Sequence, residues 1–189
     1  MMRTFDNMGA FTKVDKHMQF RKAVYGLCWF HAILIERKKF KTLGWNVSYD
    51  FNDSDYSVCE DNIAYYMGRF KDGKPIDGYE RKAPIPWQAL QFLIAEANYG
   101  GRITDDRDRR LIKVYAKEIF HDGLIAIDKW KPPGTDEFNY GYPFDEANVK
   151  QDPEELFVPR LFFEEILNKM ETIDQPAAFG QHINAEITS

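Results

Sequence analysis

The chain has 189 residues, of which 44% are hydrophobic, 15% aromatic and 29% charged, with a formal net charge of −5 at pH 7. This hydrophobic content suits a folded domain, and the acidic balance provides no global positive field for nucleic acid or an anionic membrane. The longest apolar stretch, residues 23–35, is shorter than the roughly 18 residues that a membrane-spanning helix needs, so a buried helix is predicted there.

The first predicted helix covers residues 17–39. Apolar side chains recur at helical spacing and surround its middle almost completely, which is typical of a central core helix. Its main face comprises Val24, Leu27, Cys28, His31 and Ile35, widened by Phe20, Ala23, Phe30 and Leu34. The cations of residues 37–39 suit the C-terminal end of the helix dipole, and residues 43–49 are predicted to be loop or extended chain.

Two shorter helices follow. Residues 52–55 offer N-cap side chains for a helix over residues 55–70. Its predicted buried stripe comprises Val58, Asn62, Ile63, Tyr66, Met67 and Phe70. Pro86 suits the first position of the next helix, residues 86–98, and Gly100 and Gly101 are predicted to end it in the left-handed conformation.

The second half contains two more predicted helices, over residues 104–121 and 159–173. Thr104 is the predicted cap of the former, whose buried side comprises Leu111, Ile112, Val114, Tyr115, Ile119 and Phe120. Between them, residues 124–158 form an irregular, aromatic-rich insertion, in which residues 124–127 are compatible with a short strand. A loop over residues 177–182 follows. The predicted fold class is therefore all-α, with about five helices and a long insertion.

One segment has the spacing of a phosphate-binding loop. Residues 68–75 supply both glycines and the lysine, but the eighth position is Pro75, where magnesium requires a Ser or Thr hydroxyl. The segment also follows a predicted helix rather than a strand, and Asp72 would repel bound phosphate. A polar loop that ends the helix is predicted, and no ATP site is expected in this chain.

Other candidate sites have simpler interpretations. Residues 50–55 begin like a calcium loop, but positions six and twelve are Asp55 and Asp61 instead of Gly and Glu. Cys28 and His31 share an apolar helix face, which predicts a buried thiol and a hydrogen-bonded core histidine rather than a catalytic dyad. His17, His31, His121 and His182 lack metal-ligand spacing, and the adjacent glutamates at 154–155 and 164–165 point apart. No catalytic, cofactor-binding or metal-ligating residue is therefore expected.

The expected location follows from the same residues. Two cysteines, Cys28 and Cys59, cannot form a disulfide framework. No apolar segment opens the chain, so no signal peptide is expected, and a reducing, intracellular compartment is predicted.

A charged segment alternates aspartates with arginines: Asp105, Asp106 and Asp108 interleave with Arg107, Arg109 and Arg110. Its charge sums to zero, whereas binding nucleic acid through phosphates requires surplus positive charge. Two interpretations stay open. The arginines clamp carboxylates or carbonyl groups at an interface, or the segment is a solvated face.

Several motifs, in this order along the chain, resemble the C-terminal motor region of dynein heavy chains. They cover residues 25–32, 36–40, 43–46, 50–55, 85–90, 98–110 and 179–187. The resemblance implies that residues 1–189 are one lid-like domain, a fragment that forms the helical lid of the sixth AAA+ module in the motor ring. The residues that carry its structural motif are Gly100, Gly101, Arg102, Asp105, Asp106, Asp108, Arg109 and Arg110. The family commonly has an aromatic residue where Arg107 stands.

The resemblance also implies a function. The lid is expected to be non-catalytic and to pass movement between modules, with ATP and magnesium bound elsewhere in the heavy chain. Its implied partners are other AAA+ modules, the C-terminal domain of the same heavy chain and the dynein complex subunits, with microtubules reached through distant parts. The motifs are closer to axonemal than to cytoplasmic dyneins, which implies the cytoskeleton of a cilium or flagellum. The alternatives are an autonomous helical protein-binding module with an aromatic groove at residues 130–144, and an enzyme.

Overall fold

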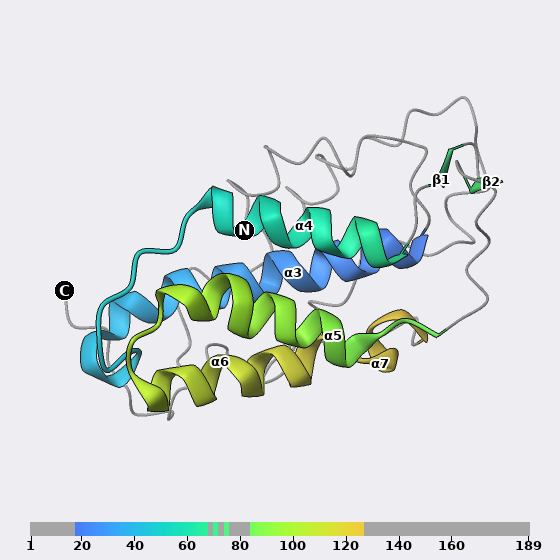
Figure 1. The fold of residues 1–189 in the computed structure, drawn as a ribbon. Coiled ribbons are helices and arrows are strands. Elements are labelled where there is room, and N and C mark those ends of the chain that lie inside the picture. Colours follow the sequence, from blue (N-terminus) through green and yellow to red (C-terminus); the bar gives the residue numbers. More distant parts are fainter. Residues whose placement is uncertain (1–17, 68–69, 72–73, 76–83, 127–189) are drawn as a thin grey trace, which may run out of the picture.

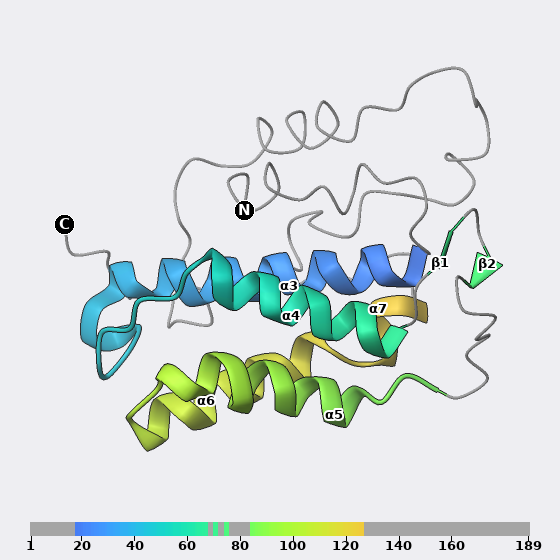
Figure 2. The same cartoon turned by 45° about the horizontal axis from the view of Figure 1, so that its top comes forward.

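The computed structural model describes residues 18–67, 70–71, 74–75 and 84–126. In these residues the long helical elements form an antiparallel bundle (Figures 1 and 2). They are α3 (Met18–Glu36), α4 (Asp53–Met67), α5 (Trp87–Phe92) with its continuation η2 (Leu93–Asn98), and α6 (Asp106–Ile119). Each runs opposite to the one before it, and the predicted all-α fold class is confirmed.

Short elements connect or extend the long ones. A 3₁₀ helix, η1 (Arg37–Leu43), continues α3, and a second, η3 (Tyr99–Arg102), leads from η2 toward α6. After α4 comes a small antiparallel hairpin, in which β1 (Phe70–Lys71) pairs with β2 (Lys74–Pro75). Residues 68–75, which have the spacing of a phosphate-binding loop, therefore follow a helix and contain a hairpin, whereas a plain polar loop was predicted.

The short strand considered as a possibility for residues 124–127 is absent from residues 124–126, which belong to the short helix α7 (Asp122–Ala126). This turn places the buried Leu124 against α3, where its methyl groups lie 3.0–3.3 Å from the position that a Cβ on Gly26 would occupy. The helical turn is also tied to α5, because Trp87 Nε1 donates a hydrogen bond to Asp122 Oδ1 at 2.6 Å.

The prediction of α3 as the central helix is confirmed. It packs against α4, α6 and α7, and its fully buried side chains include Ala23, Val24, Leu27, Phe30, His31 and Leu34. Ile35 differs from the prediction, because it lies in the last turn and is 40% exposed. The α-helix ends at Glu36, and residues 37–39 belong to η1.

The buried stripes of α4 and α6 are rotated from the predicted ones. Val58 and Val114 are about half exposed, and buried aspartates take part in each stripe. The buried residues are Asp55, Tyr56, Cys59, Ile63 and Met67 on α4, and Asp108, Ile112, Tyr115, Ala116 and Ile119 on α6. Hydrogen bonds allow these two aspartates to be buried. A buried stripe predicted from apolar residues alone therefore gives the wrong orientation of the helix.

The helix starts also differ slightly from the predictions. Asn52 caps α4, since its Oδ1 accepts hydrogen bonds from the amides of Ser54 and Asp55 at 3.0 and 3.3 Å. Asp105, rather than Thr104, caps α6 by accepting from the amides of Arg107 and Asp108. Pro86 directly precedes α5.

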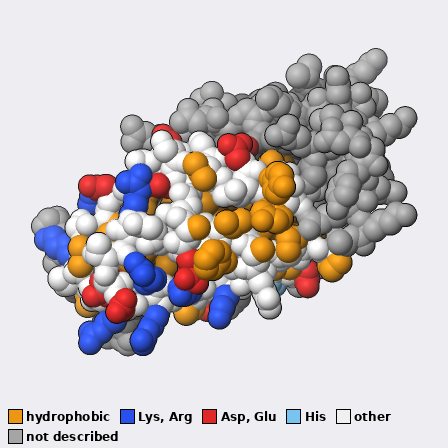
Figure 3. All heavy atoms as spheres, viewed as in Figure 1, with side chains coloured by type: hydrophobic (Ala, Val, Ile, Leu, Met, Phe, Trp, Pro, Cys, Tyr) orange, Lys and Arg blue, Asp and Glu red, His pale blue; other side chains and the backbone are white. Residues whose placement is uncertain are grey.

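The surface of the described residues is mixed. Figure 3 shows hydrophobic side chains grouped over α4 and α5, while Lys and Arg gather toward the end where η1 and the start of α6 lie. The most exposed large hydrophobic residues on α4 and α5 are Val58, Tyr65 and Phe92. None of the described helices is both long and apolar enough to cross a membrane.

Several predictions concern residues outside those described. They are the helix over 159–173, the insertion beyond residue 126 with its aromatic groove at 130–144, the glutamates at 154–155 and 164–165, the loop at 177–182 and the motif at 179–187.

Candidate functional site

Motif segments that are far apart in the sequence meet at one end of the bundle. The loop after η1, the first turn of α4, η3 and the first turn of α6 converge at the left of Figure 1. We call the polar contacts among residues 37–55, residues 98–109, His31, Cys59 and Tyr115 the junction.

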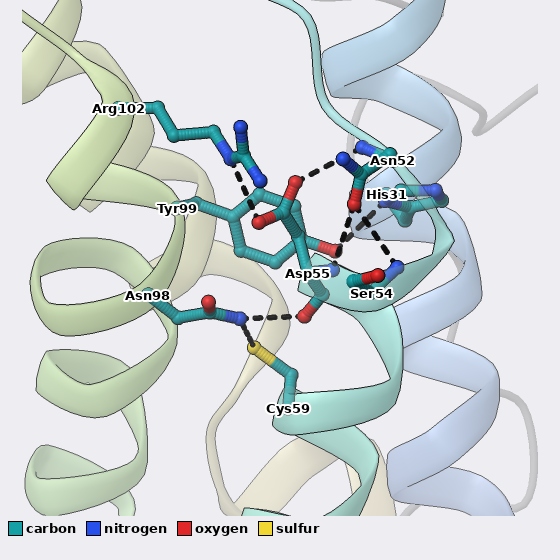
Figure 4. A network of polar contacts seen from close by, with 8 residues as sticks. All are labelled: His31, Asn52, Ser54, Asp55, Cys59, Asn98, Tyr99 and Arg102. Atoms are coloured by element: carbon teal, nitrogen blue, oxygen red, sulfur yellow. Dashed lines mark hydrogen bonds and ion pairs between the residues drawn. The ribbon is translucent and has the colours of Figure 1, made fainter.

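Asp55 lies at the centre of one half of the junction. Its side chain is buried, and Oδ2 accepts a hydrogen bond from the amide of Asn52 at 2.9 Å, which completes a reciprocal cap of α4. The other oxygen, Oδ1, accepts from Arg102 Nε at 2.9 Å (Figure 4). One carboxylate therefore fixes the start of α4 and binds η3.

Asn98 and Tyr99 bind the same region from the other side. The amide of the Asn98 side chain donates to the carbonyl of Asp55 at 2.5 Å and to Cys59 Sγ at 2.9 Å. The buried Tyr99 hydroxyl lies 2.8 Å from His31 Nδ1 (Figure 4). Burial lowers the pKa of His31 to about 4, so this contact involves a neutral imidazole near pH 7. The three contacts join η2 and η3 to α3 and α4.

Asp108 lies at the centre of the other half. This buried carboxylate accepts hydrogen bonds from the amides of Asn46 and Val47 at 3.1 and 3.2 Å, and from the Tyr49 hydroxyl at 3.0 Å. Asp105 accepts from Asn46 Nδ2 at 3.0 Å, and this bond together with the backbone bonds of the cap lowers the pKa of Asp105. The first turn of α6 is thereby bound to the loop that precedes α4.

Arg37 is a member of the junction that the sequence interpretation missed, because it placed this residue among the cations at the C-terminal end of the first helix. The guanidinium is buried, donates from Nε and Nη2 to the Gly44 carbonyl at 3.0 and 2.8 Å, and donates from Nη1 to the Tyr115 hydroxyl at 2.5 Å. It also lies over the Trp45 and Tyr115 rings, 5.5 and 5.4 Å from their centroids. Burial lowers the pKa of Arg37. The signal in the sequence was its place inside the motif at residues 36–40.

The two motif glycines have different roles. Neither has a φ in the left-handed region, so the predicted left-handed cap is wrong. A Cβ on Gly100 would lie 2.4 Å from the carbonyl oxygen of Ala95, whereas a Cβ on Gly101 would meet no atom within 4 Å. Close backbone approach therefore requires glycine at position 100 alone.

The charged motif residues are divided between the junction and the surface. Arg109 Nη2 donates to the carbonyl of Ile103 at 2.8 Å, so this arginine clamps a carbonyl within its own chain. Asp106 and Arg110 are exposed and make no side-chain hydrogen bond or ion pair with any described residue. The junction thus brings together Gly100, Arg102, Asp105, Asp108 and Arg109, and leaves Gly101, Asp106 and Arg110 outside it.

The thiols beside the junction are buried and unreactive in character. Burial raises the pKa of Cys28 and of Cys59 to about 12, and Cys28 Sγ lies 3.5 Å from the Tyr56 hydroxyl. The predicted buried thiol and core histidine are confirmed. In the part of the chain that the structure describes, no three His, Cys, Asp or Glu side chains gather in a way that could hold a metal ion. What the junction can do is hold four segments in one arrangement.

Comparison with known proteins agrees with the motifs. Residues 20–185 match the family described as the dynein heavy chain AAA lid domain. The chain is 37% identical over 179 residues to mouse dynein axonemal heavy chain 2, covering 95% of this chain and 3% of that protein. It is 34% identical over 190 residues to the Chlamydomonas reinhardtii dynein-1-beta heavy chain of the flagellar inner arm I1 complex, covering 100% and 4%. With human dynein axonemal heavy chain 10 it shares 35% over 175 residues, covering 90% and 3%.

Proposed function

Because the chain belongs to the dynein heavy chain AAA lid domain family, we propose that it is the non-catalytic lid of the sixth AAA+ module and transmits movement between modules of the motor ring. On this proposal all 189 residues are one lid domain with an insertion at residues 124–158, and ATP and magnesium bind in other modules.

The observation that carries the proposal is the convergence of the motif segments in the junction. Movement passes through a domain when its packed elements are coupled to one another and take up discrete arrangements, and hydrogen bonds between the elements provide such coupling. Asp55 joins α4 to η3, Asp108 joins α6 to the loop that precedes α4, and Arg37 joins η1 to α6. These contacts support a mechanical role better than a chemical one.

The proposed partners are the adjoining AAA+ modules and the C-terminal domain of the same heavy chain, together with other dynein subunits. The proposed location is the cytoskeleton of a cilium or flagellum. Both are supported by the relatives, whose names describe axonemal and flagellar heavy chains.

The experiment compares two carboxylates on α4 in a full heavy chain that carries this lid. Asp55→Ala removes the bond to η3, while Asp61→Ala removes an exposed carboxylate on the same helix. We expect Asp55→Ala to lower microtubule-stimulated ATP turnover at least about fivefold, the lower end of typical coupling between two sites. Basal turnover should be retained. Asp61→Ala should match the wild type.

Two results would contradict the proposal. One is equal stimulated turnover in both variants, because the junction would then be irrelevant to coupling. The other is magnesium-dependent binding or turnover of ATP by the 189-residue chain itself, which would make it catalytic.

A further inference from the structure

We propose that the π-helical turn of η2 is a register switch that couples the start of α4 to the start of α6. This inference rests on the proposed coupling role and names its moving part. The switch has the π register seen in the structure and an α register one residue shorter.

The first step is the backbone of Leu93–Asn98, which is π-helical between α5 and η3. The amide of Tyr99 donates to the carbonyl of Ile94, five residues earlier, where an α-helix would use the fourth. A π turn contains one residue more than the α turn that it replaces, and it is rare because the α form is intrinsically favoured. Other contacts must therefore hold it.

The second step is that the residues just after the turn supply such contacts. Asn98 binds the Asp55 carbonyl, the Tyr99 hydroxyl contacts His31, and Arg102 binds the Asp55 carboxylate. Figure 4 shows these side chains reaching α3 and α4 from η2 and η3. Their partners lie 43, 68 and 47 residues away in sequence, so the π register depends on the position of α4 and α3.

The third step is Gly100. In the π register the carbonyl oxygen of Ala95, five residues earlier, lies 2.4 Å from the place of a Cβ on Gly100. An α-helix accepts alanine at any interior position, and alanine is its most favourable residue. Glycine at position 100 therefore permits the π register, and a side chain there would select the α register.

The consequence is a two-way coupling. When the π turn becomes an α turn, the turn contains one residue fewer. The residues after it then rotate about the helix axis by about 100° and shift along it by about 1.5 Å. Tyr99 and Arg102 would then turn away from His31 and Asp55, and α6, which begins at Asp106, would start in a new direction. Conversely, a displaced α4 would withdraw the contacts that hold the π register, and the turn would relax.

The test reads the register directly by NMR on the 189-residue chain, through the hydrogen-bond scalar coupling of the Tyr99 amide. We expect the wild type to couple to the Ile94 carbonyl. Gly100→Ala should couple to the Ala95 carbonyl and lose the His31–Tyr99 contact, seen as altered His31 ring shifts. The matched control, Gly101→Ala, should resemble the wild type, because a Cβ there meets nothing within 4 Å.

A second variant removes the extra residue. Deletion of the exposed Ala97 should give an α turn that still delivers Tyr99 to His31, and Gly100→Ala should be tolerated in that background. A Gly100→Ala chain that keeps the Ile94 coupling would overturn the proposal, as would a deletion that loses the His31 contact.

If Gly100→Ala does not fold, the Arg102→Gln variant tests the register switch instead. Removing the Asp55 partner should populate the α register at about 1% or more, visible as relaxation dispersion over residues 99–103 that the Ala97 deletion abolishes. Arg110→Gln, at an exposed arginine of the same motif, should show none. Absence of dispersion in Arg102→Gln would overturn the switch. These measurements need neither ATP nor microtubules, so they test the switch separately from the proposed function. If the NMR results show the switch but Asp55→Ala leaves microtubule-stimulated turnover unchanged, only the proposed function is contradicted.

Discussion

Asp55 and Asp108 occupy the same position in two helices. Each is the third residue after an N-cap, which is Asn52 for α4 and Asp105 for α6. An acidic side chain there is favoured by the helix dipole, and burial is tolerated because hydrogen-bond donors surround it: an amide and the Arg102 guanidinium for Asp55, and two amides and the Tyr49 hydroxyl for Asp108. In both cases the carboxylate also reaches a segment distant in sequence, so a local capping preference becomes a long-range contact.

At the same scale, the buried His31 predicts that the folded chain loses stability as the pH falls. Its pKa is about 4 in the folded chain, against about 6.5 when unfolded, so between these values the unfolded chain binds a proton that the folded chain excludes. This contribution to stability is complete above pH 6.5 and is lost as the pH falls, by about 3 kcal/mol at pH 4.

Urea unfolding of the 189-residue chain at a series of pH values checks this. His31→Gln should flatten the fall in unfolding free energy between pH 6.5 and 4, whatever its effect at neutral pH. His121→Gln, at an exposed histidine, should keep the wild-type slope. Parallel slopes for His31→Gln and the wild type would show that His31 is not the titrating group.

At the scale of elements, the existence and helical type of the four long elements could be predicted from apolar periodicity, but α7, the 3₁₀ and π turns, and the ends and orientation of the helices could not. Arg37 at the start of η1 binds the Gly44 carbonyl, and Asn98 and Tyr99 at the end of the π turn bind Asp55 and His31, far away in sequence. Such contacts have no periodic signature. For the same reason, the sequence identifies the motif residues as a set but does not indicate which of them lie in the junction and which lie on the surface.

Arg37 supplies the prediction at this scale, because it connects η1, the following loop and α6. Arg37→Lys keeps the charge but cannot reproduce the fork that binds the Gly44 carbonyl and the Tyr115 hydroxyl together. We expect it to lower the free energy of unfolding by about 2 kcal/mol, since a buried, hydrogen-bonded charge is disturbed.

The control for this prediction is Lys38→Ala, next in the sequence. Lys38 pairs with Asp50 on the surface, where both side chains are at least half exposed, so little stability should be lost. Chemical denaturation measures both variants. If Arg37→Lys matches Lys38→Ala, the clamp does not stabilise the junction.

For the whole molecule, the large aromatic content is divided unequally. Most aromatic side chains in the described region are buried, but Tyr65 and Phe92 are 79% and 55% exposed on neighbouring helices. Single exposed aromatics are common on proteins, so neither residue by itself marks an interface.

Two phenylalanines test this division. Phe120 is fully buried, so Phe120→Ala should lower the free energy of unfolding by about 3–5 kcal/mol. Phe92 is more than half exposed, so Phe92→Ala should cost about 1 kcal/mol or less. Thermal or urea denaturation of both variants provides the comparison, and similar losses would mean that Phe92 belongs to the core.

The central position of α3 has a consequence for biosynthesis. Within the described residues α3 is made before the helices that bury it, and although α4 follows soon, other partners come much later, with His31 meeting Tyr99 across 68 residues and Lys22 meeting Ile125 across 103. At about 5–20 residues per second, a ribosome takes on the order of 10 s to supply them. During that interval α3 lacks the later part of the surface that buries it, so the nascent helix presents apolar side chains to which a chaperone binds.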